Sequence, residues 1–385
     1  MEGTAEALDA ERKRKQAMAE AMTIRPDVGF IKDVLKSGGG DLKKCYQCAT
    51  CSVVCNLSPE QSPFPRKQMI EAQWGLKDRL LADPAIWLCH NCGDCTSRCP
   101  RGAKPGEVMG ALRNQAIQHF AAPGFLGRAV SSPKTWPLLF VPGALVFGAL
   151  ALWAPKEVTE PREFANVFPL HVLEPLFFLI SGLVLLAFAV GLARFVKALR
   201  SAGANGAILA GLIPAFVEIL AHKRFKECGK EKNRYWGHLL TLWGFAGLAF
   251  MGTVVGIGSM VGIMHTPLPF WDPAMPVESI LKLFANACAA VILVGGLILL
   301  GDRVLNEEKR RTTTYFDWFF LLTIVGVVFT GILSEVLRLG EAVTAMYAIY
   351  FVHLVLIFAL FVYAPYSKFA HMLYRTVAMA AMGKR

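Results

Sequence analysis

Residues 45–56 read CYQCATCSVVCN, and residues 89–100 read CHNCGDCTSRCP. Both runs space their cysteines in the pattern C-x2-C-x2-C-x3-C. In this pattern three thiolates lie on one tight loop around a corner of an iron-sulfur cube, and the fourth cysteine points toward a second cluster. We therefore predict two [4Fe-4S] clusters whose ligands are exchanged between the runs. One predicted ligand set is Cys45, Cys48, Cys51 and Cys99, and the other is Cys89, Cys92, Cys95 and Cys55.

Disulfide bonds and zinc are the alternative uses of such cysteines. A disulfide framework requires an oxidising compartment, and zinc sites usually pair two C-x2-C units. The duplicated pattern of four favours clusters over both alternatives. The remaining cysteines, Cys228 and Cys288, stand alone, so we expect the cluster region to lie in the cytoplasm, where thiols stay reduced.

The composition requires a membrane part. The chain has 385 residues, of which 54% are hydrophobic, and its mean hydropathy is +0.43, which is too apolar for one soluble globule. The net charge of +11 could indicate nucleic acid as a partner. However, the Lys and Arg residues flank apolar segments instead of forming one basic face, so we expect membrane lipid and no nucleic acid as partner.

The apolar pattern predicts an all-α fold in which a helical ferredoxin domain precedes a transmembrane bundle. Residues 66–81 and the segment after Pro105 have helical periodicity, and the second places Val108, Leu112, Ala116 and Phe120 on one face. The expected parts are a charged tail (1–28), the two-cluster domain (29–122), a linker (123–135), the transmembrane haem b domain (136–374) and a cytoplasmic tail (375–385). The six expected spans are residues 136–153, 171–193, 236–262, 280–300, 317–337 and 346–366.

The loop charges predict the orientation. Basic residues concentrate in segments 194–235 and 302–315, whereas the loops on the opposite side hold few. By the positive-inside rule both basic segments are cytoplasmic. With an even number of spans, the cluster domain and the carboxyl terminus then also lie on the cytoplasmic side of the inner membrane.

Histidines at the ends of the spans are the candidate haem ligands. His238 opens the third span and His371 follows the sixth, so both are expected at the same depth on antiparallel helices. Two imidazoles on facing helices are the ligand arrangement of a b-type haem in a helix bundle. The alternative is that both are interfacial histidines satisfied by water. His90 and His119 are interpreted as surface or packing residues.

His353 lies too far along the sixth span to share that haem. A helix of the 18 residues from His353 to His371 would be about 27 Å long, which is most of the membrane thickness. We expect either a second haem near the outer face or a packing role for His353. The candidates for the other ligand of that second haem are His265 and His171.

Two resemblances extend this interpretation. The stretch HLVLIFALFVYAPYSKFAH, residues 353–371, resembles the last haem helix of the cytochrome b (gamma) subunits of respiratory nitrate reductases, and RRTTTYFD (310–317) and GHLLTLWGFAGL (237–248) are similar to other parts of that family. There the earlier haem helix carries a second histidine ten residues on, where this chain has Leu248. The amino-terminal half resembles the C subunit of heterodisulfide reductase. Its first run ends in Cys55-Asn56, where a Cys-Pro pair is common.

Together the two modules resemble the membrane subunits of the quinone-interacting membrane-bound oxidoreductase complexes of sulfate-reducing bacteria. The resemblance implies electron transfer between menaquinone and flavin-containing subunits similar to heterodisulfide reductase A, and from them to adenylylsulfate reductase. The alternatives are the haem subunit of a membrane heterodisulfide reductase or of an anaerobic glycerol-3-phosphate dehydrogenase, and, in another class, a membrane assembly or redox-sensing protein. The chain shows no Gly-rich dinucleotide motif, so we expect chemistry other than quinone oxidoreduction to take place on other subunits.

Overall fold

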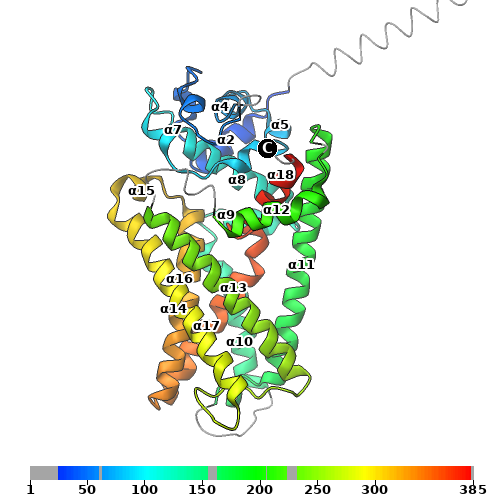
Figure 1. The fold of residues 1–385 in the computed structure, drawn as a ribbon, viewed down its shortest axis with the longest axis vertical. Coiled ribbons are helices and arrows are strands. Elements are labelled where there is room, and N and C mark those ends of the chain that lie inside the picture. Colours follow the sequence, from blue (N-terminus) through cyan, green and yellow to red (C-terminus); the bar gives the residue numbers. More distant parts are fainter. Residues whose placement is uncertain (1–24, 60–62, 155–162, 205, 223–231, 383–385) are drawn as a thin grey trace, which may run out of the picture.

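The computed structural model describes residues 25–59, 63–154, 163–204, 206–222 and 232–382. These described residues form helices joined by turns and contain no strand, which confirms the all-α fold class. Figure 1 shows two layers, with the short helices of the cluster region above a bundle of long helices. The first 24 residues of the predicted charged tail, and Cys228, lie outside the described residues.

The short helices of the cluster region pack around one longer helix. They are α2 (Val28–Lys36), η1 (Leu42–Lys44), α3 (Thr50–Val53), α4 (Arg66–Gln73), α5 (Lys77–Leu81), α6 (Ala85–Leu88), α7 (Asp94–Ser97) and α8 (Pro105–Phe120). The predicted apolar face of α8 is buried, because Val108, Leu112, Ala116 and Phe120 are each at most 4% exposed. Helices α2, α4, α5, α6 and α7 all contact α8, so one helix supports the loops that carry the cysteines.

The helix predicted over residues 66–81 is two helices, α4 and α5, divided at Gly75. Gly75 has a φ of +68°, a conformation that favours glycine. A Cβ atom there would lie 2.7 Å from the carbonyl oxygen of Asp27, whose own N–H donates to the Gly75 carbonyl at 3.0 Å. The prediction of one helix is therefore wrong because this turn docks against the start of α2.

Six helical segments of the lower layer are long and apolar enough to cross a membrane. They are Trp136–Trp153, which contains η2 (Trp136–Leu139) and α10 (Val141–Trp153), then α11 (Leu170–Ser201), Asn233–Met260 in α13 (Lys232–Met260), α14 (Pro276–Leu305), α16 (Tyr315–Leu339) and α17 (Val343–Val362). All six segments overlap the predicted spans. The shorter apolar helix α12 (Ile208–Leu220) packs against α18 (Ala370–Met382), and α15 (Glu307–Thr312) joins α14 to α16.

The sixth span ends earlier than predicted. Helix α17 stops at Val362, η5 (Ala364–Tyr366) turns the chain, and His371 is the second residue of α18. Pro365 lies in the turn, where its missing N–H and fixed φ oppose continuation of the helix. His353 and His371 are therefore not on one continuous helix, and the predicted separation of 27 Å along a helix axis does not apply.

Two segments expected to be connections are helical. Residues 124–131 of the expected linker form α9 (Gly124–Ser131), whose Val130 is buried. The expected carboxyl-terminal tail is, up to Met382, the second half of α18, and seven of its residues are buried, from Arg375 to Ala381. A free tail would expose this apolar face, so the chain buries it between α11, α12 and the cluster region.

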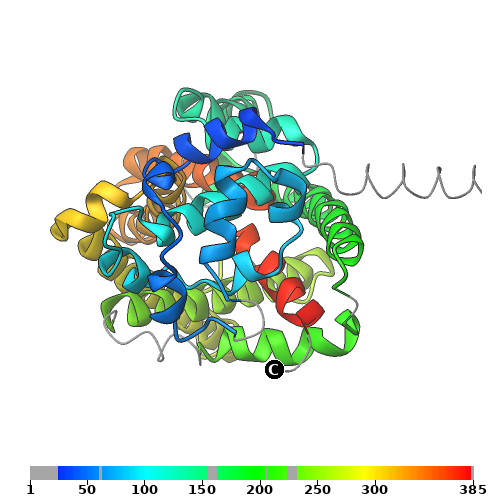
Figure 2. The ribbon, with the colours of Figure 1, turned by 90° about the horizontal axis from the view of Figure 1, so that it is seen from above.

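The two layers share one hydrophobic core. Phe195 and Leu199 of α11 and Tyr374 of α18 belong to the same buried cluster as Trp87 of α6. The Tyr374 ring stacks on the Trp87 ring with centroids 5.3 Å apart. Because α11 has 32 residues, it is about 48 Å long and extends beyond a hydrocarbon core of about 30 Å, up to the cluster region. The view from above in Figure 2 shows the cluster region lying over the bundle.

Candidate functional site

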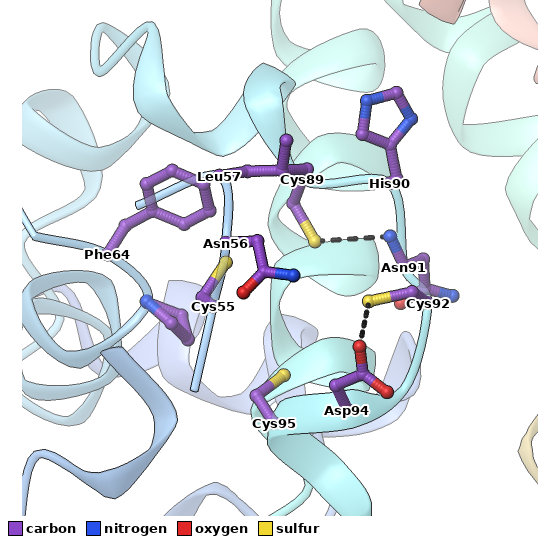
Figure 3. A pocket seen from close by; sticks show the side chains of 11 residues that line it. Cys55, Asn56, Leu57, Phe64, Cys89, His90, Asn91, Cys92, Asp94 and Cys95 are labelled. Carbon is purple, nitrogen blue, oxygen red and sulfur yellow. Dashed lines mark hydrogen bonds between the residues drawn. The ribbon is translucent and has the colours of Figure 1, made fainter. Parts of the chain in front are cut away.

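The eight motif cysteines line two separate pockets. Cys55, Cys89, Cys92 and Cys95 line one, which we call the Cys89 pocket. Cys45, Cys48, Cys51 and Cys99 line the other, which we call the Cys45 pocket. Each pocket thus combines three cysteines of one run with the last cysteine of the other run, as in the ligand sets expected from the spacing. Figure 3 shows the four sulfur atoms of the Cys89 pocket facing a common space.

The two cysteine loops have the same local shape. Gln47 and Ala49 of the first run have φ values of 67° and 69°, and Asn91 and Gly93 at the equivalent positions have 56° and 87°. In each run the second of these residues is the amino-terminal cap of a four-residue helix, α3 or α7. This left-handed geometry curls the backbone around the thiols. Asn and Gly tolerate it well, whereas Ala49 adopts it at a cost of about 1 kcal/mol.

Backbone amides point at some of the sulfur atoms. The N–H of Asn91 donates to Cys89 Sγ at 3.3 Å, and the N–H of Ala103 donates to Cys99 Sγ at 3.3 Å. Burial raises the pKa of the Cys51 and Cys55 thiols to about 11 and also raises the pKa of Cys95. These thiols are therefore neutral at physiological pH until a metal takes the place of the proton.

The pockets fit clusters better than the alternative uses of cysteine. All nine cysteines among the described residues are free thiols. In that part of the chain no three His, Cys, Asp or Glu side chains lie close enough together to hold a single metal ion. Four soft thiol donors spread around one pocket suit a four-iron cube, because each iron takes one thiolate.

The structure brings His238 and His371 together at the junction of the two layers. Their ring centroids are 6.4 Å apart, and the rings are nearly perpendicular at 79°. A metal–imidazole bond is about 2 Å long and the ring centre lies roughly 1 Å beyond the nitrogen, so axial rings on one metal have centres roughly 6 Å apart. The separation of the two rings would therefore allow both imidazoles to bind one metal between them.

Hydrogen bonds set the tautomer of both rings. His371 Nδ1 lies 2.6 Å from the carbonyl oxygen of Lys368, which can only accept, so Nδ1 carries the proton. His222 Nδ1 likewise faces the Leu220 carbonyl at 3.1 Å, so its Nε2 accepts from His238 Nδ1 at 2.8 Å. In these tautomers Nδ1 carries the proton in both His238 and His371, and Nε2 is the nitrogen without a proton. Burial also lowers the pKa of His371 to about 3, which keeps its ring neutral.

His353, His171 and His265 lie in different surroundings. His353 Nδ1 faces the Val327 carbonyl at 2.9 Å and Thr330 Oγ1 at 3.1 Å, both on α16. The His265 side chain is 81% exposed and contacts Glu278, while His171 is exposed in the first turn of α11.

Sequence reasoning missed His222, Arg234, Arg375 and the contact made by His90. His222 follows a short apolar helix, and nothing in the surrounding sequence connects it with His238. His90 is buried, and its Nε2 accepts from Arg375 Nη2 at 2.6 Å, so it is not a surface residue. His90 directly follows Cys89 in the sequence, but its partner on α18, Arg375, could not be predicted from the sequence.

Comparisons with known proteins identify the cluster region. Residues 41–103 match the family model described as a 4Fe-4S dicluster domain. The C subunit of H(2):CoB-CoM heterodisulfide,ferredoxin reductase from Methanothermobacter thermautotrophicus is 39% identical over 99 residues, which are 25% of this chain and 53% of that protein. A protein from Archaeoglobus profundus that is named as similar to heterodisulfide reductase C subunits is 37% identical over 93 residues, which are 24% of this chain and 50% of that protein.

The chain thus spans about half the length of the curated relatives it matches. No solved structure matches it. The matches support iron-sulfur electron transfer as the chemistry of the cluster region. The described part of this chain has six helices long and apolar enough to cross a membrane. Its amino-terminal region is a 4Fe-4S dicluster domain similar to that of heterodisulfide reductase C subunits.

Proposed function

We propose that this chain is the membrane electron-transfer subunit of a quinone-dependent oxidoreductase complex in the cytoplasmic membrane. It transfers electrons between menaquinone and cytoplasmic flavin and iron-sulfur subunits similar to heterodisulfide reductase A, and through them toward adenylylsulfate reductase in sulfate respiration. The cluster region and the carboxyl terminus face the cytoplasm. The main support is that His238 and His371 meet on α13 and α18, two helices that also contact the loop beside Cys89 through Arg234 and Arg375.

The residues of the chain have distinct tasks in this proposal. His238 and His371 hold a b-type haem, which supplies one-electron chemistry when bound, as do the two [4Fe-4S] clusters. His222 and the Lys368 carbonyl orient the two imidazoles. The cysteines of the two pockets hold the clusters. We include one haem per chain, on His238 and His371, and a packing role for His353, whose Nδ1 faces the Val327 carbonyl of α16.

The proposal is tested on the full chain purified in detergent. We expect a b-type α-band in the reduced-minus-oxidised spectrum, one haem per chain, and reduction of the haem by a menaquinol analogue. His371→Ala should remove the α-band and leave the intensities of both cluster signals in electron paramagnetic resonance (EPR) spectra unchanged. His119→Ala, a histidine of the cluster region outside the pair, is the matched control. Absence of an α-band in the unmodified protein would refute the haem assignment, and a haem that menaquinol cannot reduce would refute the quinone assignment.

A second candidate is the corresponding subunit of a membrane heterodisulfide reductase. It is favoured by the names of the relatives, which are subunits of CoB-CoM heterodisulfide reductases. The two candidates share the same electron path in this chain and differ in the partner. Identification of the subunits that copurify with the chain separates them.

A further inference from the structure

Three arginines connect the rest of the molecule to the loop in front of the Cys89 pocket. Arg113 of α8 donates from Nη1 to the carbonyl oxygens of Ile86 and Cys89 at 3.1 and 3.0 Å. Arg375 of α18 donates from Nη2 to His90 Nε2 at 2.6 Å and to the Leu88 carbonyl at 3.5 Å. Arg234 of α13 donates from Nη1 to the carbonyl of Asn91 at 2.5 Å. Segment 86–91 is thus held by arginines on three different helices.

Two of these arginines belong to the helices that carry the histidine pair. Arg234 precedes His238 by four residues on α13, and Arg375 follows His371 by four residues on α18. Four residues are one helical turn, or about 6 Å along the axis. Each histidine is therefore one turn away from a side chain that contacts the loop beside Cys89.

The loop of the other pocket, the Cys45 pocket, is more exposed. Cys48 is exposed, and Tyr46 and Val53 of the same loop are 58% and 83% exposed. Among the described residues, hydrogen bonds to residues 45–53 from other segments come only from Arg66 and Gln73 of α4, within the cluster region. Within the described part of the chain, none of these hydrogen bonds comes from a membrane helix.

We propose that the cluster of the Cys89 pocket is the one that exchanges electrons with the group on His238 and His371, and that Arg234 and Arg375 position it for this exchange. The cluster of the Cys45 pocket is then the outer one, which faces the soluble partner. This order rests on the proposed function. With haem and cluster bound, the exchange would transfer one electron, so that one group would be oxidised by one electron as the other is reduced, and no bond would form or break.

The guanidinium charges have a second consequence for the Cys89 pocket. Reduction adds a negative charge to a cluster, and nearby cations and hydrogen bonds stabilise the reduced form. Arg375 is only 9% exposed, so water screens its charge little. The two positioning arginines should therefore raise the potential of the Cys89-pocket cluster relative to a chain that lacks them.

The test is a redox titration of both cluster signals by EPR in the full detergent-solubilised chain. The signals are first assigned with Cys92→Ser and Cys48→Ser, which replace equivalent ligands of the two pockets. Arg375→Gln and Arg234→Gln should each lower the midpoint potential of the signal that Cys92→Ser alters and leave the other unchanged. Arg375→Lys, which keeps the charge, should lower the midpoint potential of that signal less than Arg375→Gln does. Arg338→Gln on α16, whose guanidinium contacts Glu335, is the control and should shift neither signal.

A second measurement tests the order without arginine variants. The paramagnetic haem should accelerate the spin relaxation of the signal assigned to the Cys89 pocket more than that of the other signal, and His371→Ala should remove this effect. Stronger relaxation of the Cys45-pocket signal, or arginine variants that shift that signal or neither signal, would overturn the proposal. A chain without haem would refute the proposed function, whereas the arginine variants would still report whether Arg234 and Arg375 act on the Cys89 pocket.

Discussion

His222 Nε2 accepts a hydrogen bond from His238 Nδ1 at 2.8 Å. Partners of this kind orient a metal-binding imidazole and fix its tautomer. His222 is 4% exposed and comes from the turn that follows α12, so the ligand on α13 depends on a different segment of the chain. The relationship connects the short apolar helix to the proposed haem site.

Loss of this hydrogen bond should weaken haem binding. His222→Ala leaves His238 without its acceptor, and we expect the affinity for haem to fall by about 10- to 100-fold, as for other partners of metal-ligating histidines. His222→Gln, which can still accept, should lose less. Haem per chain, measured after dilution into haem-free detergent, checks this, and an unchanged haem content in His222→Ala would contradict the orienting role.

The exchange of ligands between the two runs is testable with single serine variants. Cys99 belongs to the second run but lines the Cys45 pocket, so Cys99→Ser should alter the same EPR signal as Cys48→Ser. Cys55→Ser should alter the same signal as Cys92→Ser.

Cys288→Ser, a buried cysteine of α14, is the control and should keep both cluster signals and the full iron content. If Cys99→Ser instead altered the Cys92 signal, each run would hold its own cluster.

The shared core depends on close contact between α11 and α18. A Cβ atom on Gly191 would lie 2.6 Å from Tyr374 Oη, so Gly191→Ala forces the stacked Tyr374 ring away from Trp87. We expect a loss of about 1–3 kcal/mol in the free energy of unfolding, measured as a lower thermal midpoint in detergent.

Two further variants separate overpacking from a general effect on α11. Gly182→Ala on the same helix meets no atom within 4 Å and should stabilise the chain by up to about 1 kcal/mol through helix propensity. Tyr374→Phe removes the hydroxyl and should restore much of the stability of Gly191→Ala. Equal effects of the two alanines would argue against this contact.

Glu71 makes the stability of the cluster region depend on pH. Its side chain is 6% exposed, its Oε2 has no hydrogen-bond partner, and burial raises the pKa of its carboxyl above 4.5. The unfolded chain loses this proton first, so stability should fall as the pH rises from about 4.5 through the raised pKa.

Glu71→Gln removes the buried charge and gives up a pair with Arg79, which is 66% exposed and contributes little. At pH 7 the variant should be more stable by about 1 kcal/mol in the free energy of unfolding, measured as a higher thermal midpoint. This advantage should disappear below pH 4.5. Asp78→Asn, an exposed acid nearby, should change stability by less than about 0.5 kcal/mol at either pH. An advantage of Glu71→Gln that persists at low pH would contradict the role of the charge.

Features that depend on short-range spacing were predictable from the sequence. The duplicated cysteine pattern predicts two pockets with exchanged ligands because the chain between neighbouring ligands is only a few residues long. The apolar runs predict the six long helices because a membrane imposes a minimum length on them. The errors occurred where distant segments meet: Gly75 docks on Asp27, Pro365 ends α17, and the expected tail is buried as α18.

The sequence by itself therefore determined the chemistry available to this protein, which is eight thiols in two loops and several histidines near the ends of apolar helices. The tertiary structure alone decided which histidines meet, since His222, His238 and His371 come from three separate segments. It also decided that the loop beside Cys89 lies against α13 and α18 through Arg234 and Arg375. The physical reason is that local spacing constrains the backbone over a few residues, whereas contacts between helices follow from how the whole chain buries its apolar faces.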